Sequence, residues 1–145
     1  MAQNDLKRMI AYSSISHMGF VLIGLGSFTV EGAAGGMFQM IAHGFISAAL
    51  FLIVGVLYDR TQNREIKNFS GLATKLPGYS FVVMIVFFAS LGLPGLAGFV
   101  GELLVLMGAF NVSAVDGVLP NWIGIVAVMG LLITAAYYLW TIQRM

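Results

Sequence analysis

The sequence predicts an all-α membrane protein with about four transmembrane helices. Of its 145 residues, 59% are hydrophobic and 9% are charged, and the mean hydropathy is +0.94, which is outside the range of soluble domains. A helix needs about 20 apolar residues to cross the hydrocarbon core of a bilayer. Runs of this kind can be drawn at 6–28, 34–58, 78–111 and 119–142, so we expect a single transmembrane region with one polar loop, 59–77.

The distribution of charge supports four spans. The seven basic residues are Lys7, Arg8, Arg60, Arg64, Lys67, Lys75 and Arg144. All of them fall on one side of the membrane if the four runs cross it, whereas the two connections on the other side carry only the acids Glu31 and Asp116. By the positive-inside rule, both termini are expected in the cytoplasm or its equivalent.

Several classes of function are excluded or disfavoured by composition. The chain has no cysteine, so it cannot ligate an iron–sulfur cluster through thiolates. The net charge of +1 and the dispersed basic residues do not indicate nucleic-acid binding, and the start of the chain does not resemble a removable signal peptide. The two histidines are not at a zinc-site spacing, so we expect no metal, no cofactor and no catalytic residue on this chain.

The first run begins with Asp5, which can cap a helix. Ser13, His17 and Gly24 then fall on one stripe, because steps of four and seven residues return to the same helix face. Such serines and glycines usually pack between membrane helices, whereas His17 near mid-membrane is a candidate for a proton path. Lys7 lies at the end of the run, where it either reaches the interface or contributes to proton transfer.

The second run carries a similar stripe of Gln39, His43 and Ser47. Gly44 follows the histidine and weakens a helix by about 1 kcal/mol relative to alanine, so we predict a local break at His43. A histidine exchanges protons readily near neutral pH. The alternative is a neutral His43 that is hydrogen-bonded to a neighbouring helix.

The third run has the strongest functional signal. Pro94 is flanked by Gly92, Gly95 and Gly98, and Glu102 follows eight residues after the proline. Broken helices leave backbone groups free to face a cavity at membrane depth. An ionised carboxylate at mid-membrane costs from about 3 to more than 10 kcal/mol unless it is paired or hydrated. We therefore predict that Glu102 is a proton carrier; the alternative is a fixed hydrogen bond between helices.

The fourth run has aromatic residues near both ends. Trp122 lies near its start, and Tyr137, Tyr138 and Trp140 lie near its end. Aromatic side chains of this kind are enriched at the two membrane interfaces, so we expect all four to be interfacial anchors.

Three motifs together resemble a known family. They are DLKRMIAYSSISHMGF, then QMIAHGFISAALFL with YDR after it, and ASLGLPGLAGFVGELLVLMGAF. They resemble the proton-translocating antiporter-like subunits of respiratory complex I, and the resemblance covers essentially the whole chain. Sister subunits and Mrp-type antiporters generally have lysine at the position of Glu102. The GEL motif here is therefore most similar to the subunit M group, which is called chain 4 in mitochondria and has counterparts in photosynthetic complexes.

The resemblance implies an inverted-repeat bundle in which two helices are interrupted. It places Glu102 as the terminal acid on the second broken helix, His17 and His43 on a hydrated polar axis, and Lys7 in the DLKR motif. Family members are several times longer, and their earlier acid and lysines have no counterpart here. The resemblance therefore implies a later-half fragment of such a subunit.

The function implied by the resemblance is proton translocation in an NADH or ferredoxin:quinone oxidoreductase. NADH, flavin, iron–sulfur clusters and quinone would be bound by partner subunits, and neighbouring antiporter-like subunits would be partners. The membrane would be a bacterial cytoplasmic, mitochondrial inner or thylakoid membrane. Three alternatives stay open: a stand-alone or Mrp-type cation/proton antiporter, a haem anchor with His17 and His43 as axial ligands, and a packing fragment without function.

Overall fold

The computed structural model describes residues 3–111, 120 and 122–145, and these residues are almost entirely helical. In chain order the elements are α1 (Leu6–Gly26), α2 (Val30–Thr61), the 3₁₀ helix η1 (Ile66–Phe69), α3 (Leu72–Lys75), α4 (Pro77–Ser90), α5 (Ala97–Asn111) and α6 (Trp122–Arg144). The predicted all-α fold class is confirmed. Asp116 and the first residue of the predicted run 119–142 lie outside the described residues.

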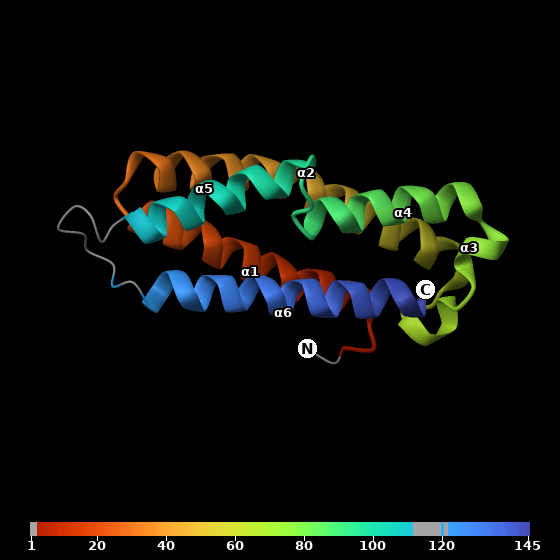
Figure 1. The fold of residues 1–145 in the computed structure, drawn as a ribbon. Coiled ribbons are helices and arrows are strands. Elements are labelled where there is room, and N and C mark those ends of the chain that lie inside the picture. Colours follow the sequence, from red (N-terminus) through yellow and green to blue (C-terminus); the bar gives the residue numbers. More distant parts are fainter. Residues whose placement is uncertain (1–2, 112–119, 121) are drawn as a thin grey trace.

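Three helices, α1, α2 and α6, are long and apolar enough to cross a membrane by themselves. A fourth span is counted when the segment 66–75 is taken together with α4, which it meets at a bend of 120°. Figure 1 shows α4 and α5 roughly end to end along the same side of the molecule, with the break of residues 91–96 between them. The predicted interruption near Pro94 is therefore confirmed.

Local chemistry fixes where the first two helices begin. The side chain of Asp5 accepts a hydrogen bond from the backbone N–H of Arg8 at 3.1 Å, as expected from the sequence. The hydroxyl of Thr29 accepts one from the N–H of Gly32 at 3.1 Å and caps α2. Both contacts satisfy backbone donors that the first turn of a helix leaves without partners.

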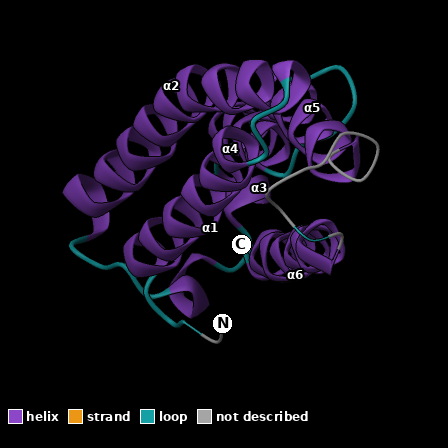
Figure 2. Cartoon of the chain, turned by 90° about the vertical axis from the view of Figure 1, so that its left-hand side faces the viewer, coloured by secondary structure: helices purple, strands orange, loops and turns teal. Residues whose placement is uncertain are grey.

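Helices α1, α2 and α5 pack closely because glycines line their contacts. A β-carbon at Gly35 of α2 would lie 2.6 Å from the backbone nitrogen of Val105 in α5. A β-carbon at Gly24 of α1 would lie 2.6 Å from the carbonyl oxygen of Gly32. Small residues allow this approach where lipid supplies no hydrophobic force between helices. Helix α6 lies on the other side of α1 from α2 (Figure 2).

The polar run after α2 is folded back onto the ends of the chain. The N–H of Leu6 donates to the carbonyl of Arg64, and the N–H of Ile66 donates to the carbonyl of Asn4, both at 2.9 Å. The N–H of Leu72 donates to the carbonyl of Met145, also at 2.9 Å. Ile66 is buried in the apolar cluster at this end, so the polar segment is anchored to the helix bundle.

The predicted break at His43 and Gly44 is wrong, because α2 is a continuous α-helix from Val30 to Thr61. A glycine costs a helix only about 1 kcal/mol, whereas an unsatisfied backbone group in hydrocarbon costs several kcal/mol. Gly44 is exposed, and a β-carbon there would meet nothing within 4 Å. The backbone hydrogen bonds of the helix therefore outweigh the weak preference of one glycine.

The expectation that Tyr138 anchors the chain at an interface is also wrong. Its side chain is fully buried, and its ring packs edge-on against Phe87 at a centroid distance of 5.5 Å. Its hydroxyl donates to Ser13 at 2.7 Å and accepts from Ser90 at 2.6 Å. Trp122, by contrast, is 61% exposed, as an interfacial side chain would be. The hydrogen bonds of its hydroxyl group to Ser13 of α1 and Ser90 of α4 hold Tyr138 inside the helix bundle.

The packing leads to a prediction that compares two glycines of α2. Gly35→Ala should lower the free energy of unfolding by about 1–3 kcal/mol, because the new methyl group would overlap the backbone of α5. Gly44→Ala should leave stability unchanged or raise it by up to about 1 kcal/mol. Unfolding of the purified protein in mixed micelles, followed by circular dichroism, measures both. A destabilised Gly44→Ala variant would contradict the continuous helix.

Candidate functional site

Glu102 lies in the second turn of α5, and its side chain points back toward the helix break. The residue is 4% exposed, although it carries a carboxyl group. A β-carbon at Gly92 would overlap its Oε2 atom, so the carboxyl group rests directly against the backbone of the break. Gly92 has a φ of +72°, which disfavours other residues at this position as well. The break thus provides a recess for the acid.

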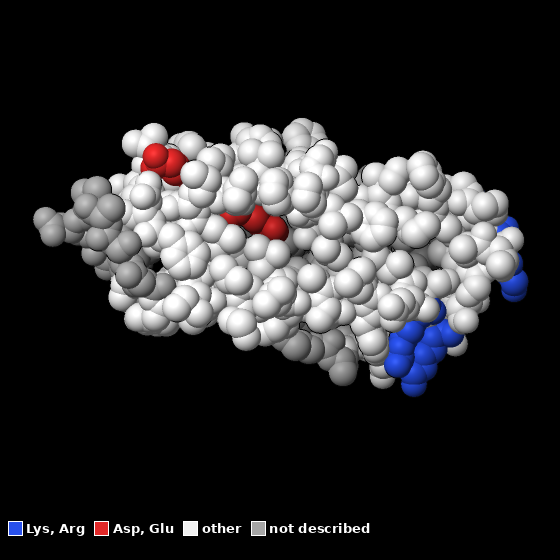
Figure 3. All heavy atoms as spheres, in the orientation of Figure 1, with Lys and Arg blue, Asp and Glu red and all other residues white. Residues whose placement is uncertain are grey.

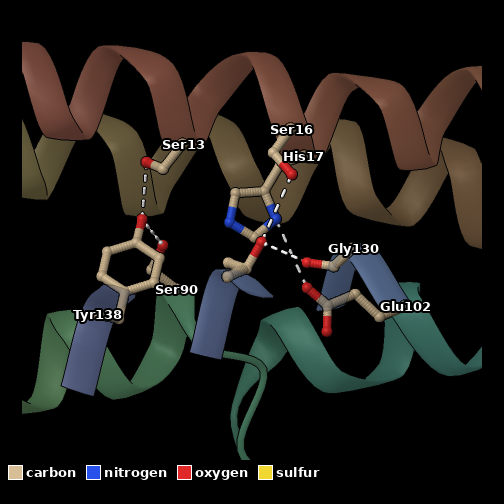
Figure 4. Close-up of polar contacts among 8 residues, drawn as sticks. Ser13, Ser16, His17, Ser90, Glu102, Gly130 and Tyr138 are labelled. Atoms are coloured by element: carbon tan, nitrogen blue, oxygen red, sulfur yellow. Dashed lines mark hydrogen bonds and ion pairs between the residues drawn. The ribbon is translucent and has the colours of Figure 1, made fainter. Parts of the chain in front are cut away.

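His17 of α1 is the nearest titratable partner of this acid. Its Nδ1 atom lies 3.5 Å from Oε1 of Glu102, as drawn in Figure 4. This separation is within ion-pair range when the imidazole is protonated, but it is longer than an ordinary N–H···O hydrogen bond. His17 is 3% exposed, and its Nε2 atom is buried without a hydrogen-bond partner among the described residues.

His43 of α2 extends the site to a third helix. The centroids of the two imidazole rings are 5.1 Å apart, and the rings are tilted by 37°. Gln39, one turn earlier on α2, is also buried, and its Oε1 atom has no hydrogen-bond partner in the part of the chain that is described. A β-carbon at Gly101 would overlap this amide oxygen, so the amide lies directly beside α5.

A second polar cluster adjoins the first along α1. Ser13 lies one turn before His17 and is joined through Tyr138 to Ser90, the last residue of α4 before the break (Figure 4). On the neighbouring turn, the hydroxyl groups of Ser16 and Thr134 are 3.4 Å apart. Ser90 is not among the site residues predicted from the sequence. No periodic pattern marks it, because its partner lies 48 residues away.

The structure brings together three of the four predicted proton-path residues. Glu102, His17 and His43 meet in one buried cluster. Lys7 is exposed at the first turn of α1, ten residues before His17, which is about 15 Å along a helix axis. Its participation in a proton path stays a prediction, and the structure does not place it in this cluster.

The predicted residues of the helix break have distinct roles. Pro94 and Gly95 are exposed in the turn between α4 and α5, and Gly95 has a φ of +96°. Gly98 is buried, and a β-carbon there would lie 2.5 Å from the carbonyl oxygen of Ala89. Gly98 thus lets the start of α5 pack against the end of α4. Within the described residues, no group of three or more histidine, cysteine or acidic side chains could hold a metal ion.

Comparison with known proteins identifies the family. Residues 1–134 match the model of the family described as NADH:quinone oxidoreductase/Mrp antiporter, TM. The chain belongs to this family. Together with its apolar helices, this membership makes it an integral membrane protein.

The similar proteins are subunits of quinone oxidoreductases. The chain is 46% identical over 144 residues to NADH-quinone oxidoreductase subunit M of Rhodobacter capsulatus and 42% identical to NADH-ubiquinone oxidoreductase chain 4 of Chondrus crispus. These alignments cover 99% of this chain but only 27% and 28% of those proteins. The resemblance to the subunit M group is thereby confirmed, and the chain spans about a quarter of the length of these relatives.

A solved structure has the same fold. A chain of the respiratory complex I from Thermus thermophilus with bound NADH matches at a TM-score of 0.89 and 40% identity. The match covers 99% of this chain and 29% of that chain. The helix arrangement around the site is therefore shared with a membrane subunit of a solved complex.

The recess at Gly92 leads to a spectroscopic prediction. Gly92→Ala should displace the carboxyl group of Glu102, so the infrared band of this group should shift or broaden relative to the unmodified protein. Gly95→Ala imposes similar backbone strain at a positive φ but places no atom near Glu102, so it should leave the band in place. The band is assigned by its loss in Glu102→Gln. Equal shifts in both variants would contradict direct contact between Gly92 and the acid.

Proposed function

We propose that Glu102, His17 and His43 form a proton-transfer site within a membrane subunit of a proton-translocating NADH or ferredoxin:quinone oxidoreductase. The observation that carries this proposal is the buried carboxyl group 3.5 Å from an imidazole whose ring contacts a second imidazole. Acids within membrane spans are rare and usually functional. In this proposal the chain binds and releases protons and carries out no redox chemistry.

The electrostatic attraction between a protonated His17 and an ionised Glu102 is similar in size to the energy that the translocation of one proton requires. Moving a proton against a total driving force of about 150 mV needs roughly 3.5 kcal/mol, since 100 mV corresponds to about 2.3 kcal/mol per charge. Two opposite charges about 4 Å apart attract each other by about 4 kcal/mol at an effective dielectric constant of 20. The attraction between a protonated His17 and an ionised Glu102 is therefore comparable to the energy needed to hold one proton, and moving the two groups apart would favour its release.

Unsatisfied polar atoms support a hydrated site. Nε2 of His17 and Oε1 of Gln39 are buried without protein partners among the described residues, and each such atom costs about 1–3 kcal/mol. Water molecules bound to them would remove this cost, because ordered water hydrogen-bonds nearly as well as protein groups. Water would also connect the two imidazoles to the helix break, where Glu102 would exchange its proton.

The comparisons favour a redox-coupled role over the alternatives. The relatives are quinone oxidoreductase subunits, which supports an assembly with other membrane-arm subunits, including neighbouring antiporter-like subunits. NADH, flavin, iron–sulfur clusters and quinone would be bound elsewhere in the complex. The bacterial relatives favour a bacterial cytoplasmic membrane. A haem anchor is disfavoured because the two imidazole rings contact each other directly.

The decisive experiment replaces the acid in the full-length subunit that contains this chain. Glu102→Gln should abolish proton pumping in membrane vesicles and lower the coupled reduction of quinone, because an amide cannot carry the proton. Glu31→Gln makes the same chemical change at the start of α2, away from the site, and should leave both activities intact. Assembly is checked by the yield of the purified complex. Pumping at the normal level in an assembled Glu102→Gln complex would refute the proposed function.

A second prediction concerns the histidines. His17→Gln should lower the rate of proton pumping by about tenfold or more, since loss of a positioned acid–base group lowers the rate of proton transfer by at least that much. Ser47→Ala is the matched control on the polar stripe of α2, because Ser47 is only half-buried and bonds to the Gly44 carbonyl of its own helix. It should have no effect. Similar losses in both variants would show that pumping does not depend specifically on the imidazole of His17.

A further inference from the structure

A basic cavity lies at the end of the molecule where α1 begins and α2 ends. It has a volume of about 180 Å³, and its lining includes Lys7, Arg64 and Tyr58, with Phe51 and Val54 below them on α2. On the face of the molecule shown in Figure 3, the visible lysine and arginine side chains lie at one end. The cavity therefore lies at the basic interface and not at the depth of Glu102.

Arg64 is held in place by contacts that leave its charge uncompensated. Its carbonyl accepts the N–H of Leu6 at 2.9 Å, and its guanidinium carbon lies 4.1 Å from the centroid of the Tyr58 ring. Its Nε atom is buried without a hydrogen-bond partner in the described part of the chain. Stacking on an aromatic ring orients a guanidinium group while its remaining donors stay available.

Asp5, Asp59 and Glu65 lie at the same end of the molecule as the two cations. Among the described residues, no acid forms an ion pair with Lys7 or Arg64. Asp5 accepts a hydrogen bond from the N–H of Arg8 instead, and Glu65 accepts one from the side chain of Asn68 at 3.5 Å. Two positive groups therefore border one cavity, and the described residues supply no counter-ion to either.

We propose that this cavity binds the phosphate group of an anionic membrane phospholipid. An arginine fork and a lysine ammonium group are the usual donors to phosphate oxygens, and basic pockets between membrane helices on the cytoplasmic side bind such headgroups. Phe51 lies seven residues before Tyr58, which is about 10 Å deeper along α2. The wall below the cations is thus apolar where an acyl chain would run, which favours a lipid over free phosphate.

This lipid site is independent of the proposed proton-transfer site. Lys7 lies about 15 Å along α1 from His17, and the lining of the cavity includes none of the residues of the proton-transfer site. Lipid binding by the purified chain therefore tests this inference without measuring transport. The two proposals can fail separately.

Native mass spectrometry of the purified chain in detergent tests the site with two lipids of identical acyl chains, phosphatidylglycerol and phosphatidylcholine. The unmodified chain should bind phosphatidylglycerol more tightly. The double variant Lys7→Gln/Arg64→Gln should weaken that binding by about tenfold or more, because each basic residue near a headgroup contributes to affinity. The matched control Lys67→Gln/Lys75→Gln removes two exposed charges at the same end and should retain the affinity.

The outcomes separate a lipid site from general charge attraction and from a site for a free anion. Equal losses in the two double variants would overturn the proposal in favour of general charge attraction. No preference for phosphatidylglycerol would overturn it as well, since the basic residues would then not select an anionic headgroup. Displacement of the lipid by inorganic phosphate would also overturn it, since the site would then take a free anion. Circular dichroism verifies that each variant is folded. If the double variant unfolds, Lys7→Gln alone replaces it in the test, because this substitution changes only an exposed side chain. The single variant should weaken lipid binding by about threefold or more.

Discussion

The close contact of α1, α2 and α5 through glycines is the constraint on which the site depends. In hydrocarbon, apolar side chains provide little reason for helices to associate, so close backbone packing must supply the attraction. Gly35 and Gly101 let α5 lie directly on α2, and this contact places Glu102 where α1 presents His17. A larger residue at either glycine would push α5 away from α2 and so move Glu102 relative to His17.

The site is also a compromise between burial and charge. Burial disfavours a charged side chain that has no partner. Side by side, the two groups can be charged together or neutral together with no change in net charge. The adjacent ring of His43 and the amide oxygen of Gln39, which has no hydrogen-bond partner among the described residues, make the surroundings of the pair polar. Apolar side chains in place of His43 and Gln39 would disfavour the charged state of the pair.

The sequence predicted the features that depend on local chemistry. Helical steps identified the stripes containing His17 and His43, and proline with three glycines identified the break before Glu102. The predictions that were wrong depended on competition between distant groups. Gly44 did not interrupt α2, because backbone hydrogen bonds in lipid are worth more than one glycine costs. Tyr138 left the interface, because Ser13 and Ser90 offered its hydroxyl partners on two other helices.

The separation of 3.5 Å between His17 and Glu102 is determined by anchors on both sides of the break. On one side, Ser90 ends α4 and is tied through Tyr138 to Ser13, one turn from His17 on the same helix. On the other side, the glycine contacts hold α5 against α2. The turn between them is exposed at Pro94 and Gly95 and carries positive φ angles at two glycines. The anchors of the site therefore lie in the helices, and the carboxyl group rests against Gly92 in the non-helical segment 91–96.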